Sequence, residues 1–189
     1  MWLSRRDRLD NPDQLIFDLD PPGKDFEPVR EAARMLRKFL GELDLETFVK
    51  TSGSRGLHII VPLDRSASFD QVRRFTQNVA GVLSEQEPGK LTSEQRKDKR
   101  EGRVFMDYLR NSYGQTVVAP YAVRAEPGAP VATPLDWDEI AEPKLTSQTY
   151  NINNISWRLT RKKDPWEGLW HKARSLDRAQ KKLDELKKP

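Results

Sequence analysis

Two acidic residues, Asp18 and Asp20, end an apolar run at residues 15–20, just before Pro21. Because successive side chains of a strand point to opposite faces, the two carboxylates share one face and lie about 7 Å apart along it. Like charges at this distance repel each other, and a divalent cation between them relieves the repulsion. The pair therefore predicts a divalent-metal site; the alternative is a solvated strand end that binds no metal.

A short glycine-rich turn carries the second group of polar residues, between Lys50 and His58. Gly53 and Gly56 allow the backbone to approach a ligand closely, and successive N–H groups in such a turn bind phosphate oxygens. Lys50, Arg55 and a protonated His58 would neutralise a polyphosphate. The turn thus predicts a nucleotide-binding site; the alternative is a hairpin with a buried structural histidine.

A third acidic residue, Asp107, interrupts the apolar stretch 104–109. A carboxylate inside a strand is costly unless it is paired or binds a metal. If this strand lies beside the first, Asp107 completes a set of three carboxylates that can hold two divalent ions. Two such ions, about 3.5–4 Å apart, activate a hydroxyl nucleophile and stabilise the leaving pyrophosphate in phosphoryl transfer. Oxygen ligands favour Mg²⁺ or Mn²⁺; the alternative for Asp107 is a buried salt bridge to an arginine.

Hydrophobic periodicity predicts the elements that position these residues. We expect strands at 14–20, at a segment ending near Thr51, and at 57–63, 104–109 and 116–124, with a hairpin around 111–114 joining the last two. We expect helices at 26–43, from Phe69 to about Val82, and at 137–141, 150–161 and 165–187. The interleaving of strands, helices and hairpins indicates an α+β fold with a mixed or antiparallel sheet flanked by helices. The whole chain, 1–189, is expected to form one domain, with a core at 1–125 followed by a proline-rich crossing and C-terminal helices at 126–189.

The composition limits the class of protein. A chain of 189 residues with 33% charged and 36% hydrophobic residues fits a domain with a sizeable core. Neither an apolar run of about 18 residues nor a secretory signal is visible, so we expect a cytoplasmic protein that does not engage a membrane. The absence of cysteine excludes disulfides and thiolate metal ligands. A net charge of +4 is compatible with an anionic partner.

A basic segment precedes Asp107 directly. Its positive residues are Arg96, Lys97, Lys99, Arg100 and Arg103. We interpret this segment as a contact for nucleic-acid phosphates. The lysine-rich tail from Arg178 to Lys188 has acidic residues interspersed, which is more typical of a solvated helix face.

Three motifs, taken in their order, resemble motifs I, II and III of the archaeo-eukaryotic primase superfamily. They are Asp18-Leu19-Asp20-Pro21, Ser52-Gly53-Ser54-Arg55-Gly56-Leu57-His58 and Asp107-Tyr108-Leu109-Arg110-Asn111. Within that superfamily the chain looks most like the polymerase domain of the prokaryotic end-joining ligase D. Further matching pieces are Lys50-Thr51, Ala119-Pro120-Tyr121-Ala122-Val123-Arg124 and Pro134-Leu135-Asp136-Trp137. The resemblance runs from Trp2 to about residue 170.

This resemblance implies an RRM-like sheet and a nucleotidyltransferase that extends DNA or RNA 3′ ends from nucleoside triphosphates in non-homologous end joining. It implies ribonucleotide preference and a two-metal site with Mn²⁺ or Mg²⁺. The implied metal ligands and catalytic residues are Asp18, Asp20 and Asp107. The residues implied to bind the nucleotide are Ser52, Arg55, His58, Arg110, Asn111 and Arg124. The implied partners are a primer-template, nucleoside triphosphates, and end-joining proteins such as Ku or a separate ligase.

Two other functions are compatible with parts of this pattern. An apolar strand ending in Asp18 and Asp20 also occurs in haloacid-dehalogenase-type phosphatases, where the first acid is the nucleophile and the second the acid/base. Pro21 and Pro22 depart from that family's pattern. The third hypothesis is a nucleic-acid-binding module that keeps the fold of this domain but has no catalytic activity. It is considered because the ligase D polymerase domain usually begins further upstream, with a subdomain that binds the DNA 5′-phosphate and stacks on the template.

Overall fold

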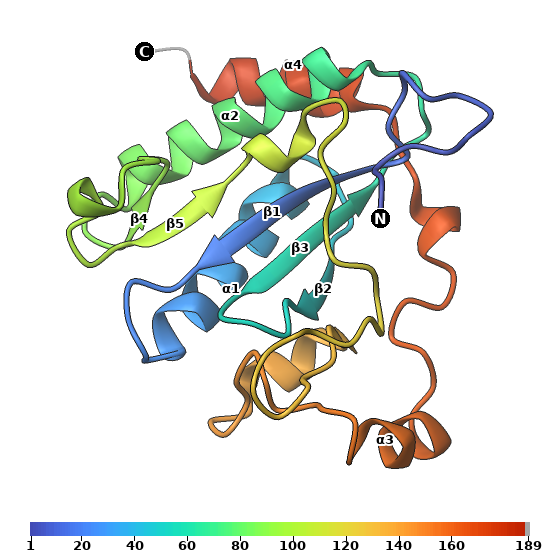
Figure 1. Cartoon of the computed structure of the whole chain (residues 1–189). Coiled ribbons are helices and arrows are strands. Elements are labelled where there is room, and N and C mark those ends of the chain that lie inside the picture. The colour runs from blue at the N-terminus through green and yellow to red at the C-terminus, as the bar shows by residue number, and fades with distance from the viewer. Residues whose placement is uncertain (188–189) are drawn as a thin grey trace.

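The computed structural model describes residues 1–187 and contains a six-stranded sheet (Figure 1). The strands are β1 (Gln14–Asp20), β2 (Phe48–Thr51), β3 (Leu57–Pro62), β4 (Leu91–Thr92), β5 (Val104–Asp107) and β6 (Pro134–Leu135), in the spatial order β4-β5-β1-β3-β2-β6. Neighbouring strands are antiparallel except β4 and β5, which are parallel. Lys188, the end of the predicted basic tail, and residue 189, the end of the predicted domain, lie outside the described residues.

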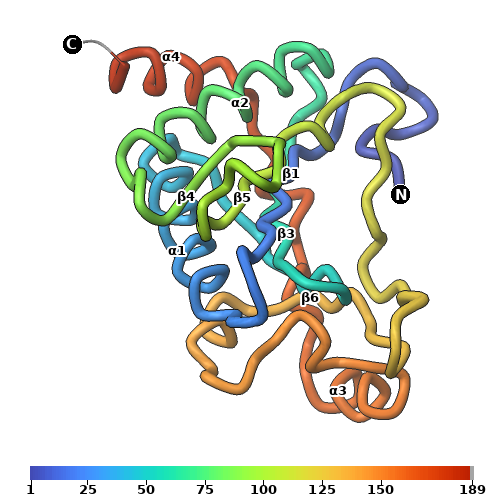
Figure 2. Tube along the Cα trace, turned by 60° about the vertical axis from the view of Figure 1, so that its left-hand side comes forward, coloured from blue at the N-terminus to red at the C-terminus, as the bar shows by residue number. Residues whose placement is uncertain are grey.

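Two long helices cover one face of this sheet (Figures 1 and 2). The α-helices are α1 (Glu27–Glu42), α2 (Phe69–Gln86), α3 (Ile155–Arg161) and α4 (Leu176–Leu186), and the 3₁₀ helices are η1 (Lys97–Lys99), η2 (Leu109–Asn111), η3 (Trp137–Ala141) and η4 (Leu169–Lys172). The central strands, in the order β5-β1-β3-β2 with α1 and α2 as connections, form the RRM-like arrangement. The prediction of an α+β fold with a mixed sheet is confirmed.

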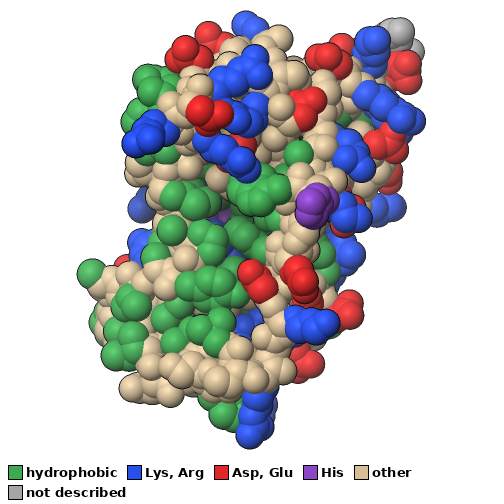
Figure 3. Space-filling model, turned by 90° about the vertical axis from the view of Figure 1, so that its right-hand side faces the viewer, with side chains coloured by type: hydrophobic (Ala, Val, Ile, Leu, Met, Phe, Trp, Pro, Cys, Tyr) green, Lys and Arg blue, Asp and Glu red, His purple; other side chains and the backbone are tan. Residues whose placement is uncertain are grey.

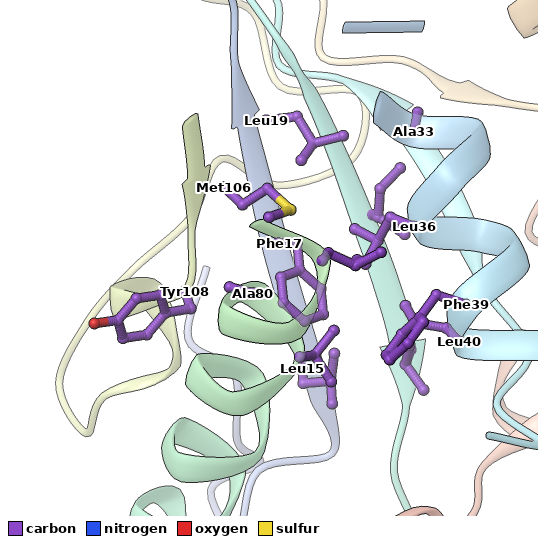
Figure 4. Close-up of a cluster of buried hydrophobic side chains, with 14 of the residues drawn as sticks. Leu15, Phe17, Leu19, Ala33, Leu36, Phe39, Leu40, Ala80, Met106 and Tyr108 are labelled. Atoms are coloured by element: carbon purple, nitrogen blue, oxygen red, sulfur yellow. The ribbon is translucent and has the colours of Figure 1, made fainter. Parts of the chain in front are cut away.

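Strand β1 shows how the sequence separates the two faces of the sheet. Leu15, Phe17 and Leu19 are fully buried against the helices (Figure 4). Ile16 points to the opposite face, where it packs in a smaller hydrophobic cluster with Leu3 and Val117. Because the strand alternates, its two acidic residues also lie on this second face, which α1 and α2 leave open. This open face carries the candidate functional site.

The predicted strand at 116–124 and the hairpin before it are wrong. After β5 the chain forms η2 and then crosses the open face in extended form; Val123 forms an isolated bridge with Val131. Tyr121 has a positive φ of 60°, which a regular strand does not accommodate. Figure 1 shows this segment running from the top of the sheet to the lobe that contains α3.

The C-terminal helices are shorter than predicted. The helix expected at 150–161 begins at Ile155, and the one expected at 165–187 is divided into η4 and α4. Gly168 has a φ of 75°, and the backbone around Arg174 extends to form a bridge with Leu63. These two features interrupt the helical pattern. The division of the chain near residue 125 stays a prediction.

A buried ion pair holds the C-terminal lobe together. Arg158 on α3 forms two hydrogen bonds with Glu139 on η3, at 2.6 and 2.8 Å, and donates a third to the carbonyl of Pro134 on β6 at 2.9 Å. The Arg158 side chain is 6% exposed and that of Glu139 15%. A bidentate, shielded pair of this kind fixes α3 to the sheet edge. Within residues 1–187, no helix is both long and apolar enough to cross a membrane.

Candidate functional site

Four ionisable side chains form one row across the open face of the sheet. Asp18 on β1 lies directly opposite Asp107 on β5 and, on its other side, opposite His58 on β3. His58 in turn lies opposite Lys50 on β2. Because directly paired residues of antiparallel strands point to the same face, the row runs Asp107, Asp18, His58, Lys50. The predicted adjacency of the first strand and the strand of Asp107 is confirmed.

Asp18 and His58 form the centre of this row. The Nε2 atom of His58 lies 3.4 Å from Oδ1 of Asp18, and the imidazole is buried. Burial raises the pKa of Asp18, but the adjacent His58, together with Arg110 and Lys50, outweighs it and leaves the pKa below its usual value. Burial also lowers the pKa of His58. Asp18 is thus held as a carboxylate, the form that can bind a cation.

Asp20 and Asp107 are partly buried carboxyl groups near the charge of Asp18. Burial raises the pKa of both carboxyl groups, and the charge of Asp18 raises it further. Asp107 accepts a hydrogen bond from the backbone N–H of Leu109 at 2.8 Å, and its other oxygen lies 3.5 Å from Nε of Arg110. Both oxygens of Asp107 therefore lie beside groups of the residues that follow it in the chain. Consistent with this, the described part of the chain contains no group of three or more His, Cys, Asp or Glu side chains arranged to hold a metal.

The turn between β2 and β3 is shaped by its glycines. A Cβ atom on Gly56 would clash with the carbonyl oxygen of Leu19 on β1, so glycine is required for close packing against that strand. Gly53 has a φ of 67°, and a Cβ there would crowd the side chain of Arg124. The sequence predicts that both glycines allow a ligand to approach the backbone. In the structure they serve the approach of neighbouring parts of the chain.

Ser52 organises the same turn. Its hydroxyl accepts hydrogen bonds from the backbone N–H groups of Ser54 and Gly56, at 3.3 and 3.0 Å. It also lies 3.0 Å from the hydroxyl of Ser147, which donates its own proton to the carbonyl of Gly56 at 2.9 Å. Ser52 must therefore be the donor in the bond between the two serines. One donor and two acceptor sites are then all used, so no hydrogen-bonding capacity of Ser52 is left for a nucleotide in this conformation.

Ser147 is a site residue that the sequence did not reveal. It is buried, and it lies 91 residues after the carbonyl to which it bonds. A serine in a proline-rich loop carries no spacing signal that links it to a turn so far away. Its role follows only from the folded structure, in which this loop packs against the turn between β2 and β3.

A cavity of about 470 Å³ opens above Asp18 and His58, the two central residues of the row. It is lined by Asp18, Asp20, Ser52, Ser54, Arg55, His58, Arg110, Thr116, Val117, Val118 and Arg124. The structure thus brings together two of the predicted metal ligands and five of the predicted nucleotide-binding residues. The extended segment after η2 supplies the wall at residues 116–118, so the part of the chain that was wrongly predicted as a strand closes the cavity.

Two predicted nucleotide-binding residues do not line the cavity. The side chain of Asn111 is fully buried and bonds to both the N–H and the carbonyl of Ile16, at 2.8 and 2.7 Å, and to the carbonyl of Tyr108 at 2.9 Å. Asn111 thereby satisfies the backbone of Ile16 on β1 at a point where β5 has ended and none of the described residues forms a strand on that side. Lys50 is 0% exposed and lies behind His58, so it does not reach the cavity either. Burial lowers the pKa of Lys50 to about 7.

Part of the positive charge of the basic segment around η1 is neutralised by ion pairs within the segment. Arg96 pairs with Asp98 at 2.8 Å, and Arg103 pairs with Glu101 at 3.2 Å. Arg100 stacks 3.8 Å above the ring of Phe105 and bonds to loop carbonyls. Lys97 and Lys99 are exposed on η1. Figure 3 shows the other side of the molecule, where hydrophobic side chains gather in the middle and positive and negative side chains are interspersed around them. Contact of the segment with nucleic acid stays a prediction.

The family model described as "LigD, primase-polymerase domain" matches residues 1–166. The chain belongs to this family. The phosphatase hypothesis, which requires another family, is not supported. The chain is 36% identical over 168 residues to the multifunctional non-homologous end joining protein LigD of Pseudomonas aeruginosa and 37% identical over 166 residues to LigD of Mycobacterium tuberculosis.

A solved structure of this family has the same fold. The polymerase domain from Mycobacterium tuberculosis ligase D in complex with DNA superposes with a TM-score of 0.79 at 35% identity, covering 86% of this chain and 56% of that one. The two LigD proteins are each matched over 87% of this chain. The chain spans 20% and 22% of their lengths, about a fifth. The similarity to LigD therefore concerns the primase-polymerase domain.

Proposed function

We propose that the cavity above Asp18 is a nucleotidyltransferase site that extends DNA or RNA 3′ ends from nucleoside triphosphates during end joining. One observation carries this proposal. The cross-strand pair of Asp18 and Asp107 lies on the sheet face where the turn 52–56 and three arginines line a cavity, in a chain of the LigD primase-polymerase family. Carboxylates beside clustered cationic donors are what a triphosphate with its metal ions requires.

The donor chemistry of the site fits a divalent cation. Asp18, Asp20 and Asp107 offer oxygen ligands. Burial raises the pKa of the last two, the charge of Asp18 raises it further, and bound Mn²⁺ or Mg²⁺ would offset both effects. Asp107 would join the other two by turning from Leu109 and Arg110. When bound, the metal ions would activate the attacking hydroxyl and stabilise the leaving group. The carboxylates themselves would hold the ions and set their place on the sheet.

The triphosphate would bind to the arginines of the cavity wall. Arg55 donates one hydrogen bond to the carbonyl of Pro21 at 3.0 Å, and Arg124 donates one to the carbonyl of Ser52 at 3.2 Å. A guanidinium has five N–H donors, so each side chain is oriented by one bond and keeps others for phosphate oxygens. Arg110 would complete the set, whereas His58, which lines the cavity with its Nε2 turned to Asp18, would act through that carboxylate rather than by direct contact. Ser52 would act by shaping the turn rather than by direct contact.

The nucleic acid would approach along the open face. The related polymerase domain of Mycobacterium tuberculosis ligase D was solved in complex with DNA, and Lys97 and Lys99 give this chain exposed cations beside β5. We propose a DNA or RNA primer-template as the substrate, ribonucleotides as the preferred triphosphates, and end-joining proteins such as Ku or a separate ligase as partners. A cytoplasmic location in a prokaryotic cell follows from this role.

Primer extension tests the proposal. The chain is incubated with a labelled primer-template, each nucleoside triphosphate, and Mn²⁺ or Mg²⁺. Extension is expected in the wild type and is expected to fall by at least a hundredfold in Asp18→Asn and Asp107→Asn, as is typical when a group that stabilises the transition state is removed. Asp70→Asn, on an exposed turn of α2, is the matched control and should retain activity.

Two outcomes would contradict it. Extension that persists in Asp18→Asn and Asp107→Asn would place the chemistry elsewhere. DNA binding that is sensitive to salt, without extension by the wild type under either metal, would instead indicate a nucleic-acid-binding module without catalysis.

A further inference from the structure

Two buried nitrogen atoms in the row lack a hydrogen-bond partner within residues 1–187. They are Nζ of Lys50 and Nδ1 of His58. Buried polar atoms are nearly always satisfied in proteins, and an exception calls for an explanation. The lysine is the stronger case, because its side chain is 0% exposed and its nitrogen is among the most costly groups to bury unpaired.

The strand register brings these two atoms to the same place. Lys50 and His58 are directly opposite each other on β2 and β3, which puts their Cβ atoms about 5 Å apart on one face of the sheet. The next residue in the row, on the far side of His58, is Asp18. Since Nε2 of the imidazole lies 3.4 Å from the Asp18 carboxylate, Nδ1 is the ring nitrogen left for Lys50.

The hydrogen-bonding capacities of the three groups agree with a single arrangement. A carboxylate accepts only, so Nε2 of His58 must carry a proton to bond with Asp18. A neutral imidazole with that proton has an acceptor at Nδ1, and an ammonium group is a donor only. In the order Lys50, His58, Asp18, one N–H of the ammonium group would therefore be matched by the acceptor at Nδ1, and the N–H at Nε2 by the carboxylate.

We propose that Lys50 is a positioning residue: its Nζ donates through one buried water to Nδ1 of His58 and so fixes the imidazole with its Nε2 proton directed at Asp18. This arrangement binds one oxygen of Asp18 to the imidazole and leaves the other for a cation. It parallels the way in which hydrogen bonds behind metal ligands fix their orientation. The inference rests on the proposed function for its effect on catalysis, but not for the hydrogen bond itself.

Nitrogen-15 NMR of the histidine rings tests the hydrogen bond without any activity. The chain has two histidines, so His171→Gln assigns the spectrum. At a pH where the ring is neutral, wild-type His58 should show a protonated Nε2 and an Nδ1 signal shifted upfield by acceptance of a hydrogen bond. In Lys50→Met, which preserves the length and removes the donor, the Nδ1 signal should move downfield while His171 stays unchanged. A wild-type His58 with its proton on Nδ1, or identical His58 signals in both proteins, would overturn the proposal.

Kinetics supply the second readout. Loss of a hydrogen bond behind a metal ligand typically lowers activity by about 10- to 100-fold, so Lys50→Met should lose this much in kcat/KM for extension, and Lys50→Arg should recover part of it. Urea denaturation checks that the variants fold; if Lys50→Met does not, Lys50→Gln takes its place. Full activity in a folded Lys50→Met would refute the positioning role. A wild type without extension would instead refute the proposed function and leave the NMR result to decide the hydrogen bond.

Discussion

The ion pair between Glu139 and Arg158 makes a prediction whose size follows from the structure. Burial alone would raise the pKa of Glu139, but hydrogen bonds from Arg158 and Lys162 outweigh it and lower the pKa from 4.5 to about 2. The carboxylate is 15% exposed, so solvent screens these interactions only partly. We expect Glu139→Gln to lose the stabilisation that this charge provides.

The sign and the pH range follow from linkage. A carboxyl group with a depressed pKa in the folded state stabilises the protein above its unfolded pKa, and this contribution disappears as the pH falls through the folded pKa. With pKa values of about 2 folded and 4.5 unfolded, the contribution of Glu139 is about 3 kcal/mol at pH 7 and about 1.4 kcal/mol at pH 3. The destabilisation caused by Glu139→Gln should shrink accordingly toward acidic pH.

Urea denaturation of the two proteins between pH 3 and pH 7 measures this difference. The control is Asp138→Asn, which removes an exposed carboxylate from the same 3₁₀ helix. It should change the free energy of unfolding by less than about 0.5 kcal/mol, as is usual for surface substitutions. If the curves of wild type and Glu139→Gln stay parallel across the pH range, the charge of Glu139 is not what stabilises the lobe.

Two further predictions concern the turn between β2 and β3. Gly56→Ala should cost several kcal/mol of unfolding free energy in urea titrations, or prevent folding, because the added methyl group meets the carbonyl of Leu19; a cost below about 1 kcal/mol would show that the strands can move apart. Ser147→Ala should cost about 1–3 kcal/mol through the buried bonds it removes, and should weaken nucleoside triphosphate binding in calorimetry by disturbing Ser52; unchanged nucleotide affinity would refute a role for Ser147 in shaping the site.

The sequence predicted the elements with a regular hydrophobic period. The strand at β1 and the helices α1 and α2 were placed to within a few residues, because burial on one face leaves a clear pattern. The strands β4 and β6 have two residues each, too few for any period. The segment at 116–124 has the composition of a strand, but Tyr121 turns the backbone and the chain finds no continuous partner there. Composition indicates a preference for extended backbone, and pairing decides whether a strand forms.

For the site, the sequence identified residue types better than their individual positions. The charge of Lys50 predicts contact with a nucleotide. In the structure Lys50 lies on β2 and its side chain is buried. The length of the turn 52–56 already indicates where Lys50 lies. Because this turn joins two antiparallel strands, Lys50 must lie opposite His58 and not in the solvent at the turn. Asn111 is different, because its bonds to Ile16 depend on where β5 stops, which no local pattern indicates.

The position of Asp18 explains why the row is centred on β1. This strand is hydrogen-bonded on both sides, to β3 and to β5, and the backbone at Asp18 is paired with residues on both. If either pairing slipped by one residue, the side chain opposite Asp18, His58 or Asp107, would point to the other face of the sheet. The register therefore fixes the positions of the charges in the row relative to each other. The pairing with β3 ends at Leu19, and Asp20 remains paired only with Phe105 on β5. The sheet therefore holds Asp18 rigidly and leaves the side of Asp20 open toward the cavity, which is the direction from which a triphosphate and its cations would enter.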